Sequence, residues 1–295
     1  MNCAIIDIGS NTVKLCIGSV DKGQIKILYQ QLESVQLSAG FNQDQEITFE
    51  TLAQLHSVLD LYIKKAQSMQ VATLKCVATE AIRKAQNEKQ ILTEIQAKIP
   101  DTSILTGQQE ATLIGQIHIQ HQTKNALIVD IGGGSVEFIE IRNGDIQNLY
   151  STPLGSIALA QKLKLEGQLS ASDIQNIKTE VNTHIRQFNI TQHLPLIGTE
   201  GAFTNLFYAL HKAKMPPASI EKLDFKSVIG QLKKWQLSSQ KQRESDPDLD
   251  PQRQHIAHIA AALLLIFLEI FESNEVWASS FGLKESLLVN TCFET

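Results

Sequence analysis

The sequence has 295 residues, which is long enough for two domains that each bury a hydrophobic core. With 43% hydrophobic and 19% charged residues, its composition is that of an ordinary globular protein. The net charge of -5 argues against a protein that binds nucleic acid through a positive surface. A polyanionic ligand would have to be held locally, against the overall field of the protein.

The cysteines and the apolar runs indicate the cellular compartment of the protein. The four cysteines are scattered without a C-x-x-C spacing, and three of them lie in apolar, strand-like runs. No signal peptide precedes the first predicted strand, and the longest apolar run, residues 259–268, is too short to cross a bilayer. We therefore expect a cytoplasmic protein with reduced cysteines and no membrane partner.

The N-terminal half predicts a meander of strands followed by alternating strands and helices. Strands are expected over residues 3–8, 13–20 and 24–29, with Asp21-Lys22-Gly23 as the second turn. The elements that follow are a helix over 48–70, a strand over 73–78, a helix over 88–99, a strand over 103–105 and a helix from 107 to about 121. This order is that of a ribonuclease-H-like domain.

The second half repeats this plan in outline. A hairpin over residues 127–140 extends through 145–150 after the turn Asn143-Gly144. A helix that follows residues 153–156 is expected to end at about 163, and a second, capped by Ser170 and Asp173, covers 170–188. Further helices are expected over 202–213, 223–237, 254–269 and 283–289. Strands are expected over 194–197 and 276–279, and a surface loop over 240–251. We predict an α/β protein with domains at 1–123 and 124–282, in which the C-terminal helix, 283–295, could pack back onto the first domain.

One strand–turn–strand pattern occurs twice in the chain. Residues 4–15 superimpose on residues 127–138 with a constant offset of 123, so that Asp7 falls on Asp130 and Gly9 on Gly132. Glycine-rich turns can direct backbone N–H groups at an anion, but an adjacent aspartate repels phosphate unless a divalent cation lies between them. The repeat predicts two similar domains that face each other across a cleft; the alternative is two unrelated buried strands that both end in Asp-Ile-Gly.

Six motifs in order extend this interpretation along almost the whole chain. They are D-I-G-S-N (7–11), T-x-A-x-R-x-A-x-N (79–87), G-x-x-E-A (107–111), D-I-G-G-G-S-x-E (130–137), P-L-G-S (153–156) and S-x-G-L-K-E (280–285). With them the sequence resembles the exopolyphosphatase/guanosine pentaphosphate phosphohydrolase (Ppx/GppA) family of the actin/Hsp70/sugar-kinase superfamily. The resemblance runs from about residue 4 to 288 and looks like the short, two-domain form of the family.

The resemblance implies a hydrolase of phosphoanhydride bonds, dependent on Mg²⁺ or alternatively Mn²⁺. It would release terminal phosphate from inorganic polyphosphate, guanosine pentaphosphate or both. Glu110 matches the family's proposed catalytic glutamate and would be the general base, and Arg83 would clamp phosphate. The implied metal ligands are Asp7, Asp130 and Glu137, and the implied phosphate-binding residues are Gly9, Ser10, Asn11, Lys14, Gly132, Gly133, Gly134 and Ser135.

Several of these residues also have a purely structural interpretation. Glu110 could complement the dipole of its helix, while Arg83 and Glu137 could face solvent. His255 and His258, at i and i+3 on one helix, are expected to be core or surface residues because no third metal ligand is in view.

Three positions depart from the family pattern. They are Gln109 in place of an acid, Thr112 in place of an arginine, and Glu200 in place of a small residue in a glycine turn. They favour the alternative function of a weakly active or non-catalytic regulator that binds polyphosphate or guanosine tetra- or pentaphosphate. A sugar or acetate kinase is disfavoured, because residues 198–201 do not form a recognisable adenosine-type turn. A homodimer is compatible with the sequence.

Overall fold

The structure is a computed structural model that describes residues 1–21 and 24–293, so the predicted turn at Lys22 and Gly23 lies outside the described residues. The chain divides into two compact units. The first contains residues 1–114 and the described part of 283–295, and the second contains residues 115–282. The predicted domains stay a prediction, because a division by packing does not show which segments fold on their own.

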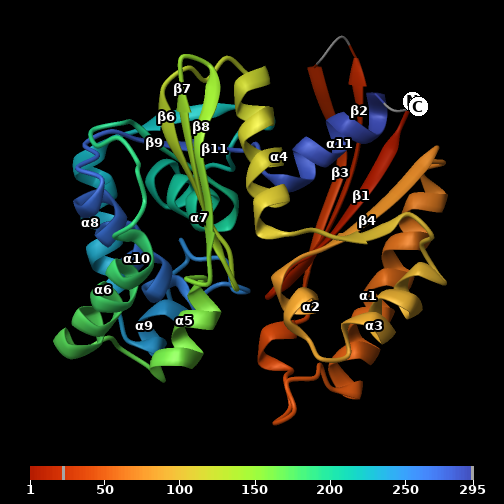
Figure 1. Cartoon of the computed structure of the whole chain (residues 1–295), viewed down its shortest axis with the longest axis horizontal. Coiled ribbons are helices and arrows are strands. Elements are labelled where there is room, and N and C mark those ends of the chain that lie inside the picture. Colours follow the sequence, from red (N-terminus) through yellow and green to blue (C-terminus); the bar gives the residue numbers. More distant parts are fainter. Residues whose placement is uncertain (22–23, 294–295) are drawn as a thin grey trace. The chain divides into compact units, whose positions relative to one another are not determined.

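The first unit is built on a five-stranded mixed sheet with the strand order β3-β2-β1-β4-β5 (Figure 1). The strands are β1 (Cys3–Ile8), β2 (Thr12–Asp21), β3 (Gln24–Ser34), β4 (Thr73–Ala78) and β5 (Thr102–Ile104). The helices are α1 (Phe49–Ser68), α2 (Glu80–Lys84), α3 (Glu88–Gln96), the start of α4 (Gly107–Gln120) and α11 (Leu283–Phe293), with a 3-10 turn η1 (Leu37–Ala39). β1 pairs antiparallel with β2 and parallel with β4.

The two faces of this sheet are covered by different helices. Alternate residues of β1 and β2, such as Ile6 and Leu15, join the apolar face of α1 in one core, and the Tyr62 hydroxyl donates to the Val13 carbonyl. On the other face lies α11, whose Leu288 Cδ2 would be 2.7 Å from a Cβ added at Gly18 of β2. A Cβ at Gly18 would also lie 2.7 Å from the Lys26 carbonyl oxygen of β3, so both the neighbouring strand and the helix favour a glycine at this point of β2.

The second unit contains a six-stranded mixed sheet with the order β10-β11-β9-β6-β7-β8. The strands are β6 (Ala126–Ile131), β7 (Val136–Arg142), β8 (Asp145–Thr152), β9 (Leu196–Thr199), β10 (Ile220–Leu223) and β11 (Val276–Ser279). The helices are the end of α4, α5 (Ser156–Leu163), α6 (Ala171–Ile185), α7 (Glu200–His211), α8 (Phe225–Gln236), α9 (Gln240–Glu244) and α10 (Ala257–Ile270). β6, β9 and β11 run parallel, so their carboxyl ends lie at one edge of the sheet.

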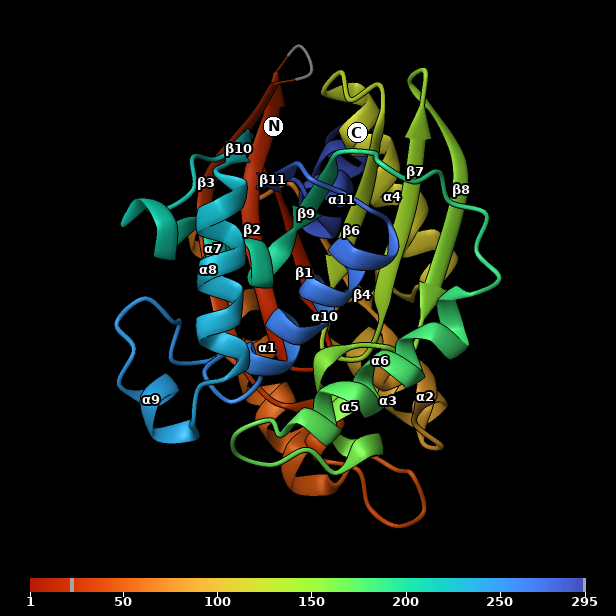
Figure 2. The same cartoon turned by 90° about the vertical axis from the view of Figure 1, so that its left-hand side faces the viewer.

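The two faces of this sheet are also covered by different helices. Val129 and Phe138 belong to a large core that α6, α8 and α10 complete on one face (Figure 2 views the unit from the side of α8 and α10). On the opposite face, a Cβ added at Gly115 of α4 would lie 3.0 Å from Ile139 of β7. Residues of β6 and β7 that point away from the large core, Asp130 and Glu137 among them, therefore lie on the face that α4 covers.

The capping box that Ser170 and Asp173 were predicted to form is confirmed. The predicted loop over 240–251 is partly wrong, because Ser239 and Gln242 form a second capping box that starts α9. The guanidinium of Arg243 on α9 is buried and donates to the carbonyls of Gly167, Ser238 and Gln254. Within the described residues, no helix combines the length and the hydropathy that spanning a bilayer requires.

The packing of α11 predicts a large loss of stability in Leu288→Ala. Leu288 is 0% exposed, and removing a buried leucine side chain costs about 2–5 kcal/mol of unfolding free energy. The control is Leu237→Ala, since Leu237 is 53% exposed and its truncation should change stability by less than about 0.5 kcal/mol. Urea unfolding followed by circular dichroism measures both. Equal effects in the two variants would contradict the packing of α11 on β2.

Candidate functional site

The duplicated turns have the same backbone hydrogen bond in both units. In the first unit, the Gly9 N–H donates to the Thr12 carbonyl over 3.0 Å. In the second, the Gly132 N–H donates to the Ser135 carbonyl, also over 3.0 Å. Donor and acceptor are each displaced by the same 123 residues as the sequence repeat. The repeat is therefore a repeat of backbone geometry as well as of residue type.

The carbonyls of the second turn are held by the start of α5. Residues 132–134 accept hydrogen bonds from the N–H groups of residues 155–157 over 2.8–3.2 Å. No peptide bond in the described chain is cis, so each N–H group points opposite to the carbonyl of the same peptide. The N–H groups of residues 133–135 consequently point away from α5. Three successive N–H groups with a common direction can bind an anion.

Gly155, in the predicted P-L-G-S motif, is what allows this contact. A Cβ at Gly155 would lie 2.2 Å from the carbonyl carbon of Gly134 and 2.5 Å from that of Gly133. These are distances that only a glycine tolerates, because backbone meets backbone there. In the first unit the η1 segment has a similar role, since the Ser10 carbonyl accepts from Ser38 and the Asn11 carbonyl from Val35 and Gln36.

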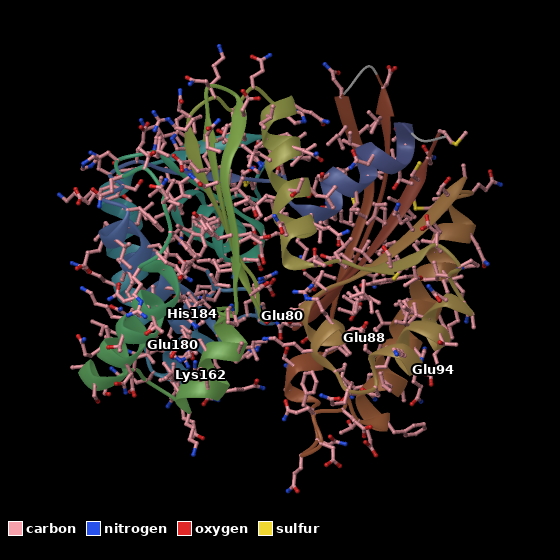
Figure 3. The ribbon with its side chains drawn as sticks, in the orientation of Figure 1. Glu80, Glu88, Glu94, Lys162, Glu180 and His184 are labelled. Atoms are coloured by element: carbon pink, nitrogen blue, oxygen red, sulfur yellow. The ribbon has the colours of Figure 1, made fainter. Side chains whose placement is uncertain are left out.

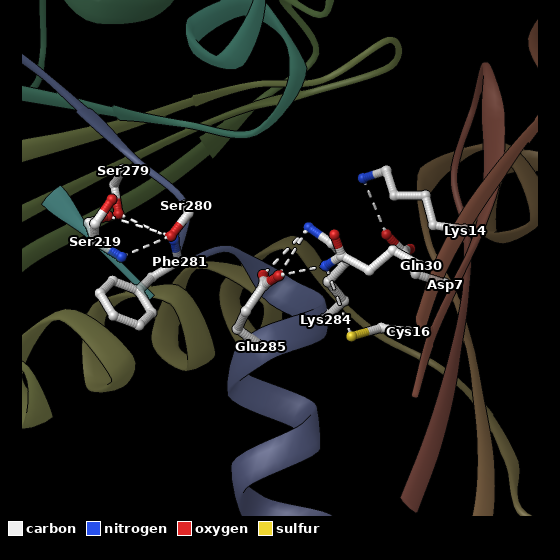
Figure 4. Close-up of polar contacts among 10 residues, drawn as sticks. All are labelled: Asp7, Lys14, Cys16, Gln30, Ser219, Ser279, Ser280, Phe281, Lys284 and Glu285. Atoms are coloured by element: carbon white, nitrogen blue, oxygen red, sulfur yellow. Dashed lines mark hydrogen bonds and ion pairs between the residues drawn. The ribbon is translucent and has the colours of Figure 1, made fainter. Parts of the chain in front are cut away.

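The two hairpins differ in the residue that lies opposite the aspartate. Asp7 is in register with Lys14, and their side chains form an ion pair of 3.2 Å (Figure 4). In the second unit Asp130 is in register with Glu137, and both are buried, with exposed fractions of 8% and 3%. Two carboxylates directly opposite each other on neighbouring strands destabilise a sheet unless a cation or a proton offsets their repulsion.

The pair of Asp130 and Glu137 fits a hydrated Mg²⁺ ion. Ser151 of β8 donates to Glu137 Oε1 over 2.8 Å and so orients this carboxylate. Within the described chain, no three His, Cys, Asp or Glu side chains form a complete set of metal ligands. Mg²⁺ does not need such a set, since it commonly takes one or two carboxylates and keeps several waters. Asp7, the other predicted ligand, forms its ion pair with Lys14.

Arg83 and Glu110 form an ion pair in the first unit. Arg83 Nη1 lies 2.9 Å from Glu110 Oε1 and also contacts the Leu105 carbonyl. Glu110 is in the first turn of α4 and is only 7% exposed, while a quarter of the Arg83 side chain is exposed. A buried carboxylate held by a guanidinium has a defined orientation, which a general base needs.

Two of the departures from the family pattern have structural roles. Gln109 forms a reciprocal cap at the start of α4: its Oε1 accepts from the Thr106 N–H over 2.8 Å, and its own N–H donates to Thr106 Oγ1 over 3.2 Å. Thr112 Oγ1 donates to the Gln108 carbonyl.

Glu200, at the start of α7, adopts a left-handed backbone with φ 61°, a conformation that favours glycine. Its Oε1 would lie 2.5 Å from a Cβ added at Gly282.

Glu80 is a buried acid that the motif analysis did not single out. It lies on α2 and is 4% exposed (Figure 3). Its Oε1 pairs with Lys84, while Oε2 is buried without a hydrogen bond from any described residue. The i, i+4 spacing to a lysine was the only sequence signal for it. Of His255 and His258 in the second unit, His258 is buried, and burial together with the Arg243 charge lowers its pKa to about 3.

Comparisons with known proteins agree with the predicted family. Residues 16–293 match the model of the Ppx/GppA phosphatase family. A Haemophilus influenzae protein named "Putative exopolyphosphatase" is 25% identical over 190 residues, which are 63% of this chain and 59% of that protein, less than two thirds of its length.

Two solved structures share the fold of the whole chain. An exopolyphosphatase from Cytophaga hutchinsonii has a TM-score of 0.84 at 23% identity and covers 100% of this chain and 99% of its own. The Aquifex aeolicus member of the Ppx/GppA family has a TM-score of 0.83 at 21% identity, covering 100% of this chain and 98% of its own. The predicted fold class, α/β of the actin-like type with two mixed sheets, is confirmed.

The contact of Gly155 with the glycine turn predicts that Gly155→Ala destabilises the protein. The new methyl group must displace the turn, and forced backbone shifts of this kind cost about 1–3 kcal/mol. Gly230 of α8 is the control, because a Cβ there meets nothing within 4 Å and Gly230→Ala should be neutral or stabilising by up to about 1 kcal/mol. Thermal unfolding followed by circular dichroism compares the variants. If Gly155→Ala has the same midpoint of thermal unfolding as wild type, the turn can shift without loss of stability.

Proposed function

Because the chain belongs to the Ppx/GppA phosphatase family, we propose that it is a Mg²⁺-dependent hydrolase of phosphoanhydride bonds. Its substrate would be inorganic polyphosphate, guanosine pentaphosphate or both, from which it releases the terminal phosphate. The observation that carries this proposal is the pair of buried carboxylates, Asp130 and Glu137, next to a turn whose N–H groups share one direction. A buried acidic pair suits a divalent cation, and the turn suits a phosphate.

Asp130 and Glu137 would hold the cation, with Ser151 orienting Glu137. When bound, Mg²⁺ would supply positive charge to the phosphate oxygens and to the leaving oxygen. Asp7, paired with Lys14, is the counterpart of Asp130 in the first unit and stays a proposed metal ligand. The ammonium group of Lys14 would supply positive charge to a phosphate oxygen. Phosphate would thus meet local positive charge despite the net charge of -5.

The two turns would position the substrate. Ser10 and Asn11 of the first turn and residues 133–135 of the second would donate backbone N–H groups to phosphate oxygens, while the N–H groups of Gly9 and Gly132 close their turns. Such donors are fixed before the substrate arrives, so they stabilise the charge of the transition state without reorganising. Phosphoryl transfer depends mainly on positioning and on charge stabilisation, which is the chemistry that these turns can provide.

Glu110 would orient the attacking water and accept its proton. The ion pair with Arg83 holds one carboxylate oxygen in place. Arg83 has five N–H donors, and those not used by Glu110 and Leu105 could bind the terminal phosphate as a planar fork. One arginine would thereby fix the base and the phosphate relative to each other.

A regulator that binds the same phosphates without hydrolysis is the second candidate. Glu200 favours it, because a carboxylate at the start of α7 competes with an anionic ligand for the positive end of that helix. Either function would be exercised in the cytoplasm, which suits four free cysteines. A homodimer is compatible with both functions.

Phosphate release by the purified protein distinguishes the two candidates. Long-chain polyphosphate, tripolyphosphate and guanosine pentaphosphate are each incubated with Mg²⁺, with Mn²⁺ and with EDTA. The proposal predicts release with at least one substrate that stops when EDTA removes the metal. No release from a protein that still binds these compounds would establish the regulator instead.

Asp130→Asn should raise the Mg²⁺ concentration needed for half-maximal activity and lower turnover at saturating Mg²⁺. The substitution removes one of the two negative charges proposed to hold the cation, while keeping the size of the side chain. Loss of one ligand should weaken metal binding by about tenfold or more. The measurement is the rate of phosphate release as a function of Mg²⁺. A wild-type rate at low Mg²⁺ would mean that the cation binds elsewhere.

Glu110→Gln should lower turnover by about 10²–10⁴-fold, the usual contribution of general acid–base catalysis, with substrate affinity nearly unchanged. The amide keeps the shape of the side chain but cannot accept the proton. Glu88→Gln is the matched control, since Glu88 also stands in the first turn of a helix, α3 (Figure 3). It should retain full activity. Rates and substrate affinities are compared at equal Mg²⁺.

The companion variant Gln109→Glu should be neutral or mildly activating, because glutamate can also cap α4. If Glu110→Gln keeps most of the wild-type activity, Glu110 is not the base.

A further inference from the structure

Asp130 has a second neighbour in the sheet that no motif had pointed to. On one side it is in register with Glu137 of β7, and on the other with Thr199, the last residue of β9. Residues in register on adjacent strands point to the same face and lie about 5 Å apart. Leu196 of β9 belongs to the large core on the opposite face, and by the alternation of the strand Thr199 points away from that core. Thr199 therefore lies beside Asp130 on the face of the acidic pair.

The hydroxyl of Thr199 has no hydrogen bond from any described residue. The residue is 0% exposed, so water does not reach it from the surface. It is the N-cap of α7, where a threonine normally accepts a hydrogen bond from the helix backbone, yet its side chain makes no such bond. A buried hydroxyl without a partner has lost its hydrogen bonds to water and gained none in return, which destabilises the fold. A residue in this state is expected where a ligand supplies the missing partner.

The neighbour on the far side of Thr199 does not supply this partner. Ser279 of β11 is in register with Thr199, but its hydroxyl lies 2.9 Å from His118 Nε2 and accepts the Phe281 N–H over 3.1 Å (Figure 4). The ring of His118 is itself buried. Of the two residues in register with Thr199, Asp130 is therefore the one that we consider as the neighbour of its hydroxyl.

The backbone conformation of the next residue helps to fix the position of Thr199. Glu200 follows with φ 61°, which ends β9 and starts α7 within one residue. A left-handed conformation in a residue other than glycine persists only where the surrounding structure enforces it, and it is often found at functional sites. The position of Thr199 is thus set by the strand on one side and by a strained turn on the other.

We propose that Thr199 completes the cation site of Asp130 and Glu137. With the cation bound, the Thr199 hydroxyl donates its hydrogen to the Asp130 carboxylate and directs its lone pairs to the cation or to a water bound to it. A hydroxyl can serve in both directions, and a neutral oxygen is a donor that Mg²⁺ and Mn²⁺ accept. This inference rests on the proposed function, since it needs a cation at the acidic pair.

The test measures metal binding without substrate. Mn²⁺ is titrated into the purified protein, and free Mn²⁺ is followed by electron paramagnetic resonance. Thr199→Val keeps the shape but lacks the hydroxyl, and should bind Mn²⁺ about 10–100-fold more weakly, as expected for loss of a group that supports a metal ligand. Thr199→Ser keeps the hydroxyl and should stay within about threefold of wild type. Thr204→Val is the control, since the Thr204 hydroxyl bonds only the Gly201 carbonyl within α7; it should bind as wild type does.

Equal Mn²⁺ affinity in Thr199→Val and wild type overturns the inference, and leaves the proposed function intact if wild type releases phosphate. A wild type that neither binds Mn²⁺ nor releases phosphate overturns both. If Thr199→Val does not fold, as judged by thermal unfolding, Thr199→Cys replaces it. The thiol should weaken Mn²⁺ binding and strengthen binding of the softer Cd²⁺. Unchanged affinities for both metals in Thr199→Cys also overturn the inference.

Discussion

The repulsion between two buried carboxylates is the constraint that organises the second unit's site. Asp130 and Glu137 lie opposite each other because β6 and β7 are joined by a turn of four residues, 132–135, that fixes their register. The fold cannot separate them without changing the hairpin. A divalent cation bound beside the pair would offset this repulsion. Neighbouring polar groups, Ser151 and Thr199, lie in the same row across the sheet.

The hairpin of the first unit has the same geometry but a different residue opposite its aspartate. Its hairpin repeats the turn and the aspartate, but Lys14 stands where the second unit has Glu137, and Asp7 is neutralised by an ion pair. The hairpin of the second unit is thus suited to bind a metal ion, whereas the hairpin of the first unit carries a cationic side chain, Lys14. Under the proposed function, each hairpin would supply local positive charge to phosphate in a protein whose net charge is -5.

Much of the fold followed from the sequence because its signals are local. Buried strands, amphipathic helices and the capping residues of α6 were readable from spacing alone. The short helix α9 was missed although its capping box, Ser239 with Gln242, is a local signal. The hydrogen bonds of Arg243 to the carbonyls of Gly167, Ser238 and Gln254 could not be read from periodicity. The strand β10 was missed because four residues at a sheet edge carry too little pattern.

The candidate site was predictable where it lies on motifs and hidden where it depends on pairing between strands. Asp130 and Glu137 are seven residues apart in one motif, so the sequence could group them. Thr199 is far from both in sequence and becomes their neighbour only through the parallel pairing of β6 with β9. That Lys14 lies opposite Asp7 likewise required the register of β1 and β2.

Glu200 shows how the cost of a departure from a family pattern can be partly offset. A left-handed backbone costs a residue other than glycine about 1–2 kcal/mol. A carboxylate in the first turn of a helix returns about 0.3–1 kcal/mol through the helix dipole, and α7 begins at Glu200. The dipole therefore offsets part of the backbone cost of the glutamate. The consequence of Glu200 for binding lies in the charge that it places at the start of α7, directly after the strand that carries Thr199. Any anion drawn to that helix must compete with a carboxylate that is already there.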